Sequence, residues 1–250
     1  MGRLPNAPLQ EVIFEVRWEL DVQDGTNLFH DPKFELGLGG LRALVRDRFP
    51  EVVRKFPEVI PVQLLPHTAT WQFRPGPAGW PLIQLGHGVL TVNDTDLAYD
   101  WDTVFFPLIK DALAWLEKAY DGAPSFSMAE LRYIDSVRTS EHTFKDWGSF
   151  VSDNLNVSVS NQFKLRGAVL NVGLHQVFEL ENGGQLLVVV NSGKRENDDA
   201  MIWQTAVNQP GPFDTASLLH WADGAHKLSK ELFQELCKPP FHERFARPRN

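Results

Sequence analysis

The stretch "APLQEVIFEVRWEL", residues 7–20, decides the fold. Val12, Phe14, Val16 and Trp18 share one face, and Glu11, Glu15, Arg17 and Glu19 are among the residues of the other. This is the period of a strand with one buried and one wet face. A similar stretch, "APSFSMAELRYIDSV" at residues 123–137, begins about half the chain later. We therefore expect each stretch to open one of two related units.

The segments that follow these two strands are predicted to have matching order. In the first half we expect a helix over 34–49 that ends at Pro50, strands over 62–74 and 81–93 joined by the turn "RPGPAGWP", and an amphipathic helix over 103–119. In the second half we expect a helix over 143–155 capped by Thr143, strands over about 166–180, 185–193 and 200–209, and a helix over 214–237 capped by Asp214 and stopped by "KPP".

This order predicts an α+β fold made of two strand–helix–strands–helix halves, residues 1–122 and 123–250. Joined edge to edge, the halves would form one curved antiparallel sheet covered by helices, and two exposed sheet edges would disappear. The arrangement would be similar to the saddle of the TATA-box-binding protein by analogy, within one continuous domain. Two separate domains are the alternative.

Composition restricts the setting of the protein. The 250 residues carry 24 basic and 32 acidic side chains, a net charge of −8. Direct nucleic-acid binding is therefore disfavoured, and the best candidate for a local basic patch is the tail "HERFARPRN". Cys237 is the single cysteine, which is typical of a reducing cytoplasm. The sequence has no signal core and no stretch of about 20 apolar residues, so we expect a cytoplasmic protein without membrane spans.

The segment "IQLGHGVLTVND", residues 83–94, allows a functional and a structural interpretation. His87 between Gly86 and Gly88 could be a base or ligand that the glycines expose. Read as one strand, the segment instead makes the glycines a bulge or a close contact with a neighbour. The structural interpretation is favoured, because no nucleophile motif accompanies the histidine.

Two acidic segments are candidates for chemistry. The run "NDTDLAYDWD", residues 93–102, lacks the glycine and the distal glutamate of a calcium loop. Its aspartates are better suited to capping the helix that begins near Thr103. Asp135 lies among apolar neighbours in "ELRYIDSV". It could be a proton acceptor with a shifted pKa, although a structural polar partner is the favoured interpretation.

Common catalytic and cofactor signatures are missing from the sequence. His226 has no second histidine four residues away, so the HExxH zinc pattern is absent. There is also no CxxC pair, no phosphate-binding GxxxxGK[ST] loop, no GxGxxG before a helix and no GxSxG elbow. We therefore predict neither a metal nor a cofactor, and lean away from an enzyme.

Four segments together resemble an uncharacterised, sporadically distributed family of bacterial proteins of about 250 residues, which carries a number but no assigned function. They are "LPNAPLQEVIFEVRW", "IQLGHGVLTVND…YDWDTVFFPLI", "LRYID" and "WADGAHKLSKELFQEL", in that order. The chain departs from the family at His87, where relatives vary, and at Asp135, where asparagine is expected. The resemblance implies an accessory or regulatory protein, since sporadic distribution fits mobile or defence-associated genes.

The leading hypothesis is a non-enzymatic protein-binding module that serves as an accessory to a bacterial defence or stress system. Its exposed anchors would come from the tryptophans, Trp80 and Trp203 among them. The alternative is a small-molecule or nucleotide sensor, or a cryptic hydrolase, with a pocket between the two halves. That hypothesis requires the side chains of His87, Arg132, Asp135 and His226 to converge. The sequence leaves the oligomeric state open.

Overall fold

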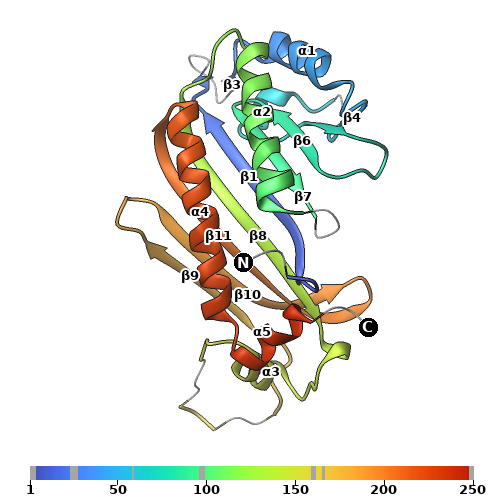
Figure 1. Cartoon of the computed structure of the whole chain (residues 1–250), viewed down its shortest axis with the longest axis vertical. Coiled ribbons are helices and arrows are strands. Elements are labelled where there is room, and N and C mark those ends of the chain that lie inside the picture. The colour runs from blue at the N-terminus through green and yellow to red at the C-terminus, as the bar shows by residue number, and fades with distance from the viewer. Residues whose placement is uncertain are drawn as a thin grey trace. The chain divides into compact units, whose positions relative to one another are not determined.

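The computed structural model describes residues 4–22, 28–57, 59–95, 99–158, 162–164 and 167–247. Within these ranges nine strands form one antiparallel sheet in the order β4-β5-β6-β7-β1-β8-β11-β10-β9, with β4 and β9 at its two ends (Figure 1). The predicted α+β class is confirmed, whereas the saddle analogy and the duplication stay predictions. The strands of the sheet are β1 (Leu9–Trp18), β4 (Glu51–Arg54), β5 (Trp71–Arg74), β6 (Leu82–Gly86), β7 (Val89–Asp94), β8 (Phe126–Arg138), β9 (Gly173–Glu179), β10 (Gln185–Arg195) and β11 (Asp198–Phe213).

Helices and short elements connect these strands. A separate two-stranded pair joins β2 (Asp21–Val22) to β3 (Phe29–His30). The α-helices are α1 (Phe34–Val45), α2 (Phe106–Ala119), α3 (Trp147–Asn154), α4 (Thr215–Leu236) and α5 (Pro239–Ala246). A π-helical turn, Trp101–Phe105, leads into α2, and short 3-10 turns cover Val62–Leu64 and Thr139–Glu141.

The contacts divide the chain into two compact units. Unit 1 comprises Met1–Glu11, Arg132–Val207 and Gly224–Asn250, and unit 2 comprises Val12–Leu131 and Asn208–Asp223. The long strands β1, β8 and β11 contribute residues to both. The predicted division into 1–122 and 123–250 stays a prediction.

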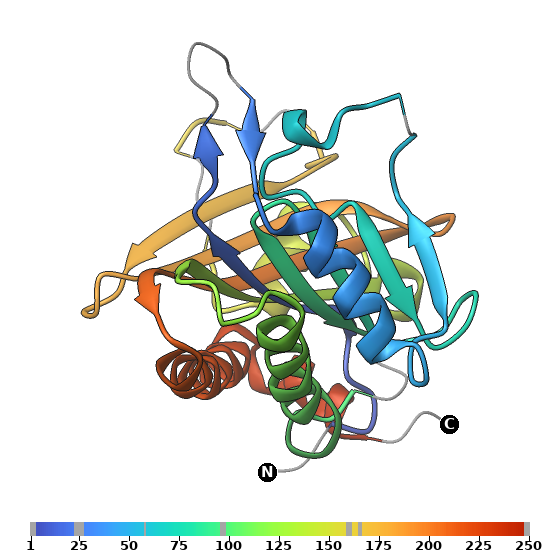
Figure 2. The ribbon, with the colours of Figure 1, turned by 90° about the horizontal axis from the view of Figure 1, so that it is seen from above.

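In unit 2, strand β1 has the predicted buried face, which consists of Val12, Phe14, Val16 and Trp18. Helices α1 and α2 of the same unit pack against each other beside the strands of this unit (Figure 2). The Trp18 ring meets Tyr120 edge-on, with centroids 5.6 Å apart. Both side chains donate a hydrogen bond of 3.1 Å to the buried Asp31 carboxylate. This shared acceptor satisfies the polar ends of two large core side chains.

The segment "IQLGHGVLTVND" is a tight hairpin, so its assignment to a single strand was wrong. Strand β6 ends at Gly86, β7 begins at Val89, and these two residues are register partners. His87 and Gly88 alone make the turn, in which Gly88 adopts φ 70°. A residue with a side chain is strained at this positive φ, whereas glycine adopts it freely because it has no Cβ. The sequence signal was missed because a His–Gly turn lacks the Asn–Gly or Asp–Gly signature of common hairpins.

The region before this hairpin also differs from expectation. Residues 62–74 are not one strand, because only Trp71–Arg74 is extended in the sheet and Val62–Leu64 forms a 3-10 turn. The short strand β4 was not predicted at all. Prolines at 57, 61 and 66 interrupt the intervening chain, and proline removes a ladder donor. The predicted turn "RPGPAGWP" does connect antiparallel partners, β5 and β6.

Helix caps explain where three helices begin. The Asp100 carboxylate accepts from the Thr103 backbone N–H at 2.9 Å, so the predicted capping role of the acidic run is confirmed. The predicted cap Asp214 likewise accepts from the Ser217 N–H at 2.7 Å. Thr143 was the wrong cap for the helix near residue 147: α3 begins later, and Asp146 caps it. "KPP" ends α4 but also starts α5, where proline occupies the first turn.

We expect Asp100→Ala to destabilise unit 2 by about 1 kcal/mol, because the Thr103 N–H loses its acceptor at the helix start. Asp102→Ala removes an equal charge from the same turn but no cap, and its cost should be about 0.5 kcal/mol or less. Urea unfolding followed by circular dichroism measures both. Equal losses for the two variants would contradict the capping role.

In unit 1 the core forms around Trp203, which is fully buried. Its ring stacks near Phe233 of α4, with centroids 6.3 Å apart, and meets Phe241 of α5 at 6.2 Å. The α4–α5 junction is tied to the end of α3 by hydrogen bonds from Asn156 N–H to Leu236 O (2.8 Å) and from Lys238 N–H to Asn154 O (2.9 Å). Helices α3 and α5 therefore meet at one end of this unit (Figure 1).

Candidate functional site

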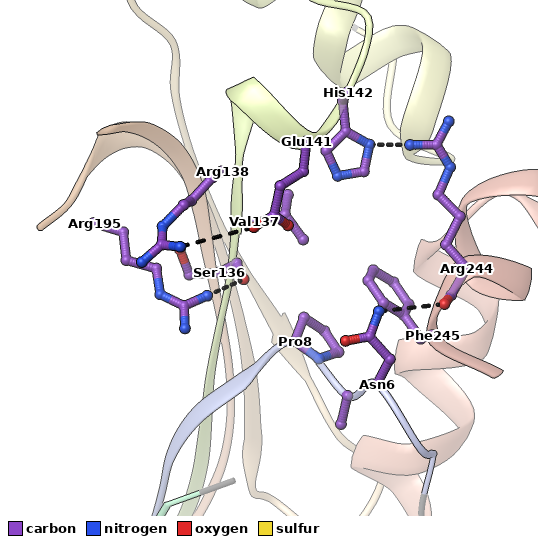
Figure 3. A pocket seen from close by; sticks show the side chains of 11 residues that line it. Asn6, Pro8, Ser136, Val137, Arg138, Glu141, His142, Arg195, Arg244 and Phe245 are labelled. Carbon is purple, nitrogen blue, oxygen red and sulfur yellow. Dashed lines mark hydrogen bonds and ion pairs between the residues drawn. The ribbon is translucent and has the colours of Figure 1, made fainter. Parts of the chain in front are cut away.

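A pocket of about 300 Å³ lies within unit 1. Four segments distant in the sequence form it: the residues before β1, the end of β8 with the turn after it, the end of β10, and α5. Figure 3 shows Arg138 and Arg195 on one side, His142 and Arg244 on another, and Glu141 between them. The lining residues are Asn6, Ala7, Pro8, Ser136, Val137, Arg138, Glu141, His142, Arg195, Arg244 and Phe245.

Backbone hydrogen bonds hold the walls of the pocket together. The Ser136 N–H donates to Pro8 O at 2.9 Å, and the Asn6 N–H donates to Phe245 O at 3.0 Å. The segment before β1 is thereby fastened to β8 on one side and to α5 on the other. Regular structure thus positions the arginines, which reduces the conformational entropy that a ligand must remove on binding.

The three arginines of the pocket differ in their partners. Arg138 is shared among acidic side chains, at 2.7 Å from Glu196, 3.5 Å from Asp198 and 3.9 Å from Glu141. Within the described parts of the chain, Arg195 donates a single long bond of 3.4 Å, to Ser136 O. Among the described residues, neither Arg195 nor Arg244 has a carboxylate within ion-pair distance. Two guanidinium groups therefore face the pocket with donors left for an anion.

His142 and Arg244 form a pair at the rim. An Arg244 N–H contacts His142 Nδ1, and since a guanidinium has only donors, Nδ1 must be the acceptor. The neutral ring then carries its proton on Nε2. Burial, and next the Arg244 charge, lower the pKa of His142, which keeps the ring in that form. Phe150 and Phe241 hold the ring, each with its centroid 5.6 Å away.

A second hollow shares the lining residue His142 with this pocket. Its volume is about 470 Å³, and it is open to solvent. Here the Lys194 ammonium lies 3.7 Å from the Asp199 carboxylate, so the charges are largely balanced. Phe144, which is 39% exposed, adds an apolar surface. The two hollows that share His142, one of them lined by three arginines, are together called the arginine groove below.

The residues expected to converge are divided between the units. Of the four, Arg132, Asp135 and His226 belong to unit 1, whereas His87 belongs to unit 2. The two tryptophans named as possible anchors are also divided, with Trp203 in unit 1 and Trp80 in unit 2. The Tyr133 hydroxyl joins His226 Nδ1 at 2.7 Å. A pocket between the two halves, the alternative functional hypothesis, stays a prediction.

Asp135 is 5% exposed, and burial raises its pKa to about 7. This is the direction that its apolar neighbours in the sequence suggested. Nearby, burial and then the Asp135 charge raise the pKa of the Cys237 thiol to about 12. A thiol with such a pKa is protonated at neutral pH and is a poor nucleophile. The pair therefore supports a structural role more than a catalytic one.

His87 lies in the interior of unit 2, only 3% exposed. Its ring packs on Phe34 with centroids 4.1 Å apart, and neither ring nitrogen has a hydrogen-bond partner in the described parts of the chain. Burial lowers its pKa, which favours the neutral ring. These contacts support the structural interpretation of His87.

The tryptophans offer few exposed anchors. Trp203 is fully buried, so it is a core residue and not part of an accessible surface. Trp80 is partly exposed, and the Arg74 guanidinium lies 5.4 Å from the centre of its ring. Trp18, Trp101, Trp147 and Trp221 are buried as well.

Sequence reasoning did not single out Arg138, His142 or Arg195. The tail "HERFARPRN" was the best candidate for a local basic patch, and Arg244 lies in it, although residues 248–250 fall outside the described ranges. Arg138 and His142 lie four residues apart, but Arg195 and Arg244 follow at steps of roughly 50 residues, so no local motif indicates the set. Only the pairing of β8, β10 and α5 brings them together.

Comparison of the chain with protein-family models, curated proteins and solved structures gives no match. Over the described ranges, no helix has the length and apolar character needed to cross a membrane. The same ranges hold no group of three or more His, Cys, Asp or Glu side chains suited to binding a metal ion.

Proposed function

We propose that this protein is a non-enzymatic regulatory module that binds a protein partner by taking an acidic side chain into the arginine groove. The observation that supports this is the pair of guanidinium groups, Arg195 and Arg244, that face the pocket without carboxylate partners in the described chain. Arginine binds carboxylates with two parallel hydrogen bonds, which adds geometric specificity to the attraction.

Two separate hollows that share His142 favour a peptide segment, which can place one side chain in each, over a compact ligand. A partner's carboxylate would enter between Arg195 and Arg244, and a neighbouring apolar side chain would cover the exposed Phe144 ring. Arginine and aromatic residues are enriched at such interfaces. Because Lys194 and Asp199 balance each other, the second hollow would accept a neutral part of the segment. A partner from a bacterial defence or stress system remains the biological setting that the family resemblance suggests.

The first test uses a capped peptide with one aspartate followed by leucine, and its asparagine counterpart. We expect the aspartate peptide to bind with millimolar or better affinity and to shift amide resonances around Arg195 and Arg244. In the double variant Arg195→Ala/Arg244→Ala, affinity should fall tenfold or more, since a hydrogen bond to a charged group contributes about 1.5–3 kcal/mol.

The matched control is Arg42→Ala/Arg46→Ala, which removes an exposed arginine of α1 and the exposed arginine at its C-cap, both in unit 2, and changes the net charge equally. Its affinity should stay within about twofold of the parent if long-range charge is screened. Equal binding of the aspartate and asparagine peptides, or equal losses in both double variants, would refute specific carboxylate recognition.

A second candidate is a sensor of a small phosphorylated molecule, favoured by the pocket volume of about 300 Å³. That volume is at the lower end of small-molecule sites. Titration with inorganic phosphate and with a nucleoside monophosphate separates the two functions. Tighter binding of the nucleotide than of the aspartate peptide would favour the sensor.

A further inference from the structure

Strand β9 is the last strand of the sheet, so it has no strand on its outer side among the residues that the structure describes (Figure 1). The direction of its hydrogen bonds follows from its pairing with β10. Ser192 N–H bonds to Val172 O (2.9 Å) at one end, and Leu180 N–H bonds to Gly184 O (2.8 Å) at the other. In an antiparallel pair every second residue is bonded to the partner strand. Even-numbered residues therefore face β10, and odd-numbered residues direct their N–H and C=O groups outward.

The outward groups belong to Gly173, His175, Val177 and Glu179, and no backbone hydrogen bond to this side occurs among the described residues. Side chains on β9 are also accessible: Val177 is 54% and Phe178 is 45% exposed. Natural edge strands are usually shortened or carry proline, lysine or a bulge that prevents pairing. Strand β9 has seven residues, pairs with β10 without a bulge and contains neither proline nor lysine, and its one acidic side chain, Glu179, stands at its end.

The opposite end of the sheet is protected in the ordinary way. Strand β4 has four residues, "EVVR", with a charged side chain at each end. The two edges thus differ in length and in charge. This contrast indicates that β9 is left open for pairing and is not an edge that the fold merely tolerates.

From these features we infer that β9 pairs antiparallel with β9 of a second copy of this chain across a two-fold axis. The occupant is identified by self-complementarity. With the axis at Val177, each His175 lies opposite Glu179 of the other copy, and the imidazole N–H can donate to the carboxylate. Both pairs are formed by outward-facing residues, which exchange two hydrogen bonds per pair.

Other registers are less complementary. With the axis at Gln176, His175 would face Val177 and Glu179 would face Gly173. With the axis at His175, the two histidines would face each other and Glu179 would have no opposite residue within the strand. The register centred on Val177 also brings the two exposed Val177 side chains together. A two-fold axis is the commonest symmetry of homo-oligomers, and it requires such self-complementarity.

A single pair of short strands buries less surface than the roughly 1,200 Å² of a stable interface. The dimer should therefore be weak, with a dissociation constant on the order of 10–100 μM. Sedimentation equilibrium between 1 μM and 1 mM total chain should show a monomer that converts to a dimer. A monomer throughout this range overturns the inference, even if the edge captures an added strand peptide.

Substitutions on β9 test the pairing itself. Val177→Pro removes an outward N–H but no bond to β10, so it should abolish dimerisation while circular dichroism stays native. Glu179→Lys should weaken the dimer tenfold or more by placing a cation opposite His175. The double variant His175→Glu/Glu179→Lys restores opposite charges in the same register and should recover dimerisation.

The matched control is Gln176→Lys, which adds one exposed charge to the same strand but leaves both His175–Glu179 pairs intact. It should dimerise more strongly than Glu179→Lys. Dimerisation of Val177→Pro at the parent's affinity, or no recovery in the double variant, would contradict the β9 pairing or its register. None of these residues lines the arginine groove, so peptide binding by the variants tests the proposed function separately.

Discussion

Gly86→Ala is expected to destabilise the protein by about 3 kcal/mol or more, the cost of an overpacked site that cannot relax. A Cβ at this position would lie 1.9 Å from the Thr68 carbonyl oxygen and 2.7 Å from its carbon. The segment around Thr68 cannot move away freely. It is held to the hairpin by bonds from His67 N–H to His87 O (2.9 Å) and from Thr70 N–H to Leu85 O (3.0 Å).

Gly39→Ala is the matched control, because Gly39 lies within α1 and no atom is within 4 Å of its added Cβ. Alanine should stabilise this helix by about 0.5–1 kcal/mol through its higher helix propensity. Urea unfolding should therefore show that the same glycine-to-alanine change lowers the free energy of unfolding at Gly86 and raises it at Gly39. A Gly86→Ala variant within about 0.5 kcal/mol of the parent would show that the hairpin and the segment over it can separate.

Asp135→Asn is expected to stabilise the protein at pH 8 and to have little effect near pH 4. The folded-state pKa of Asp135 is raised from 3.8 to about 7 because burial disfavours the charged form. The contribution of Asp135 to the free energy of unfolding is therefore fully present below the unfolded-state pKa. It is lost as the pH rises through the folded-state pKa. Asparagine does not ionise, so its contribution to stability does not change over this pH range.

The size of the effect follows from linkage. A difference of one pKa unit between the folded and unfolded states corresponds to about 1.4 kcal/mol. Because the pKa of Asp135 is about 7 in the folded state against 3.8, the free energy of unfolding should fall by on the order of 4 kcal/mol between pH 4 and pH 8. Thermal unfolding at several pH values should show a melting temperature that falls with pH more steeply for the parent than for Asp135→Asn.

Asp153→Asn, at an exposed aspartate of α3, serves as the comparison. It removes the same charge from a solvated site and should change the pH dependence little. If Asp135→Asn follows the parent's pH profile, the Asp135 carboxyl is hydrated or paired in solution and its burial does not control stability. Cys237 provides a second readout, since its thiol should stay unreactive toward alkylating reagents at neutral pH in the folded protein.

Local signals in the sequence predicted the elements whose cause is local. The alternation along β1 gave its buried face, because the strand period of two acts residue by residue. The caps Asp100 and Asp214 were predictable, because a carboxylate reaches an N–H three residues away. Thr143 was predicted where Asp146 is the cap, because both types of residue cap helices and the apolar pattern does not set a boundary to within three residues.

Tertiary structure alone decided the features that depend on distant pairing. The turn at His87 and Gly88 is visible only once Gly86 and Val89 are seen as partners, and the buried ring of His87 follows from that turn. The arginine groove needs β8, β10 and α5 in place, because Arg138, Arg195 and Arg244 share no local pattern. By itself the sequence determined an acidic α+β chain with a half-buried first strand. The groove and the open edge of β9 are set by which strands and helices lie side by side, and that depends on packing energies summed over the whole chain, not on neighbouring residues.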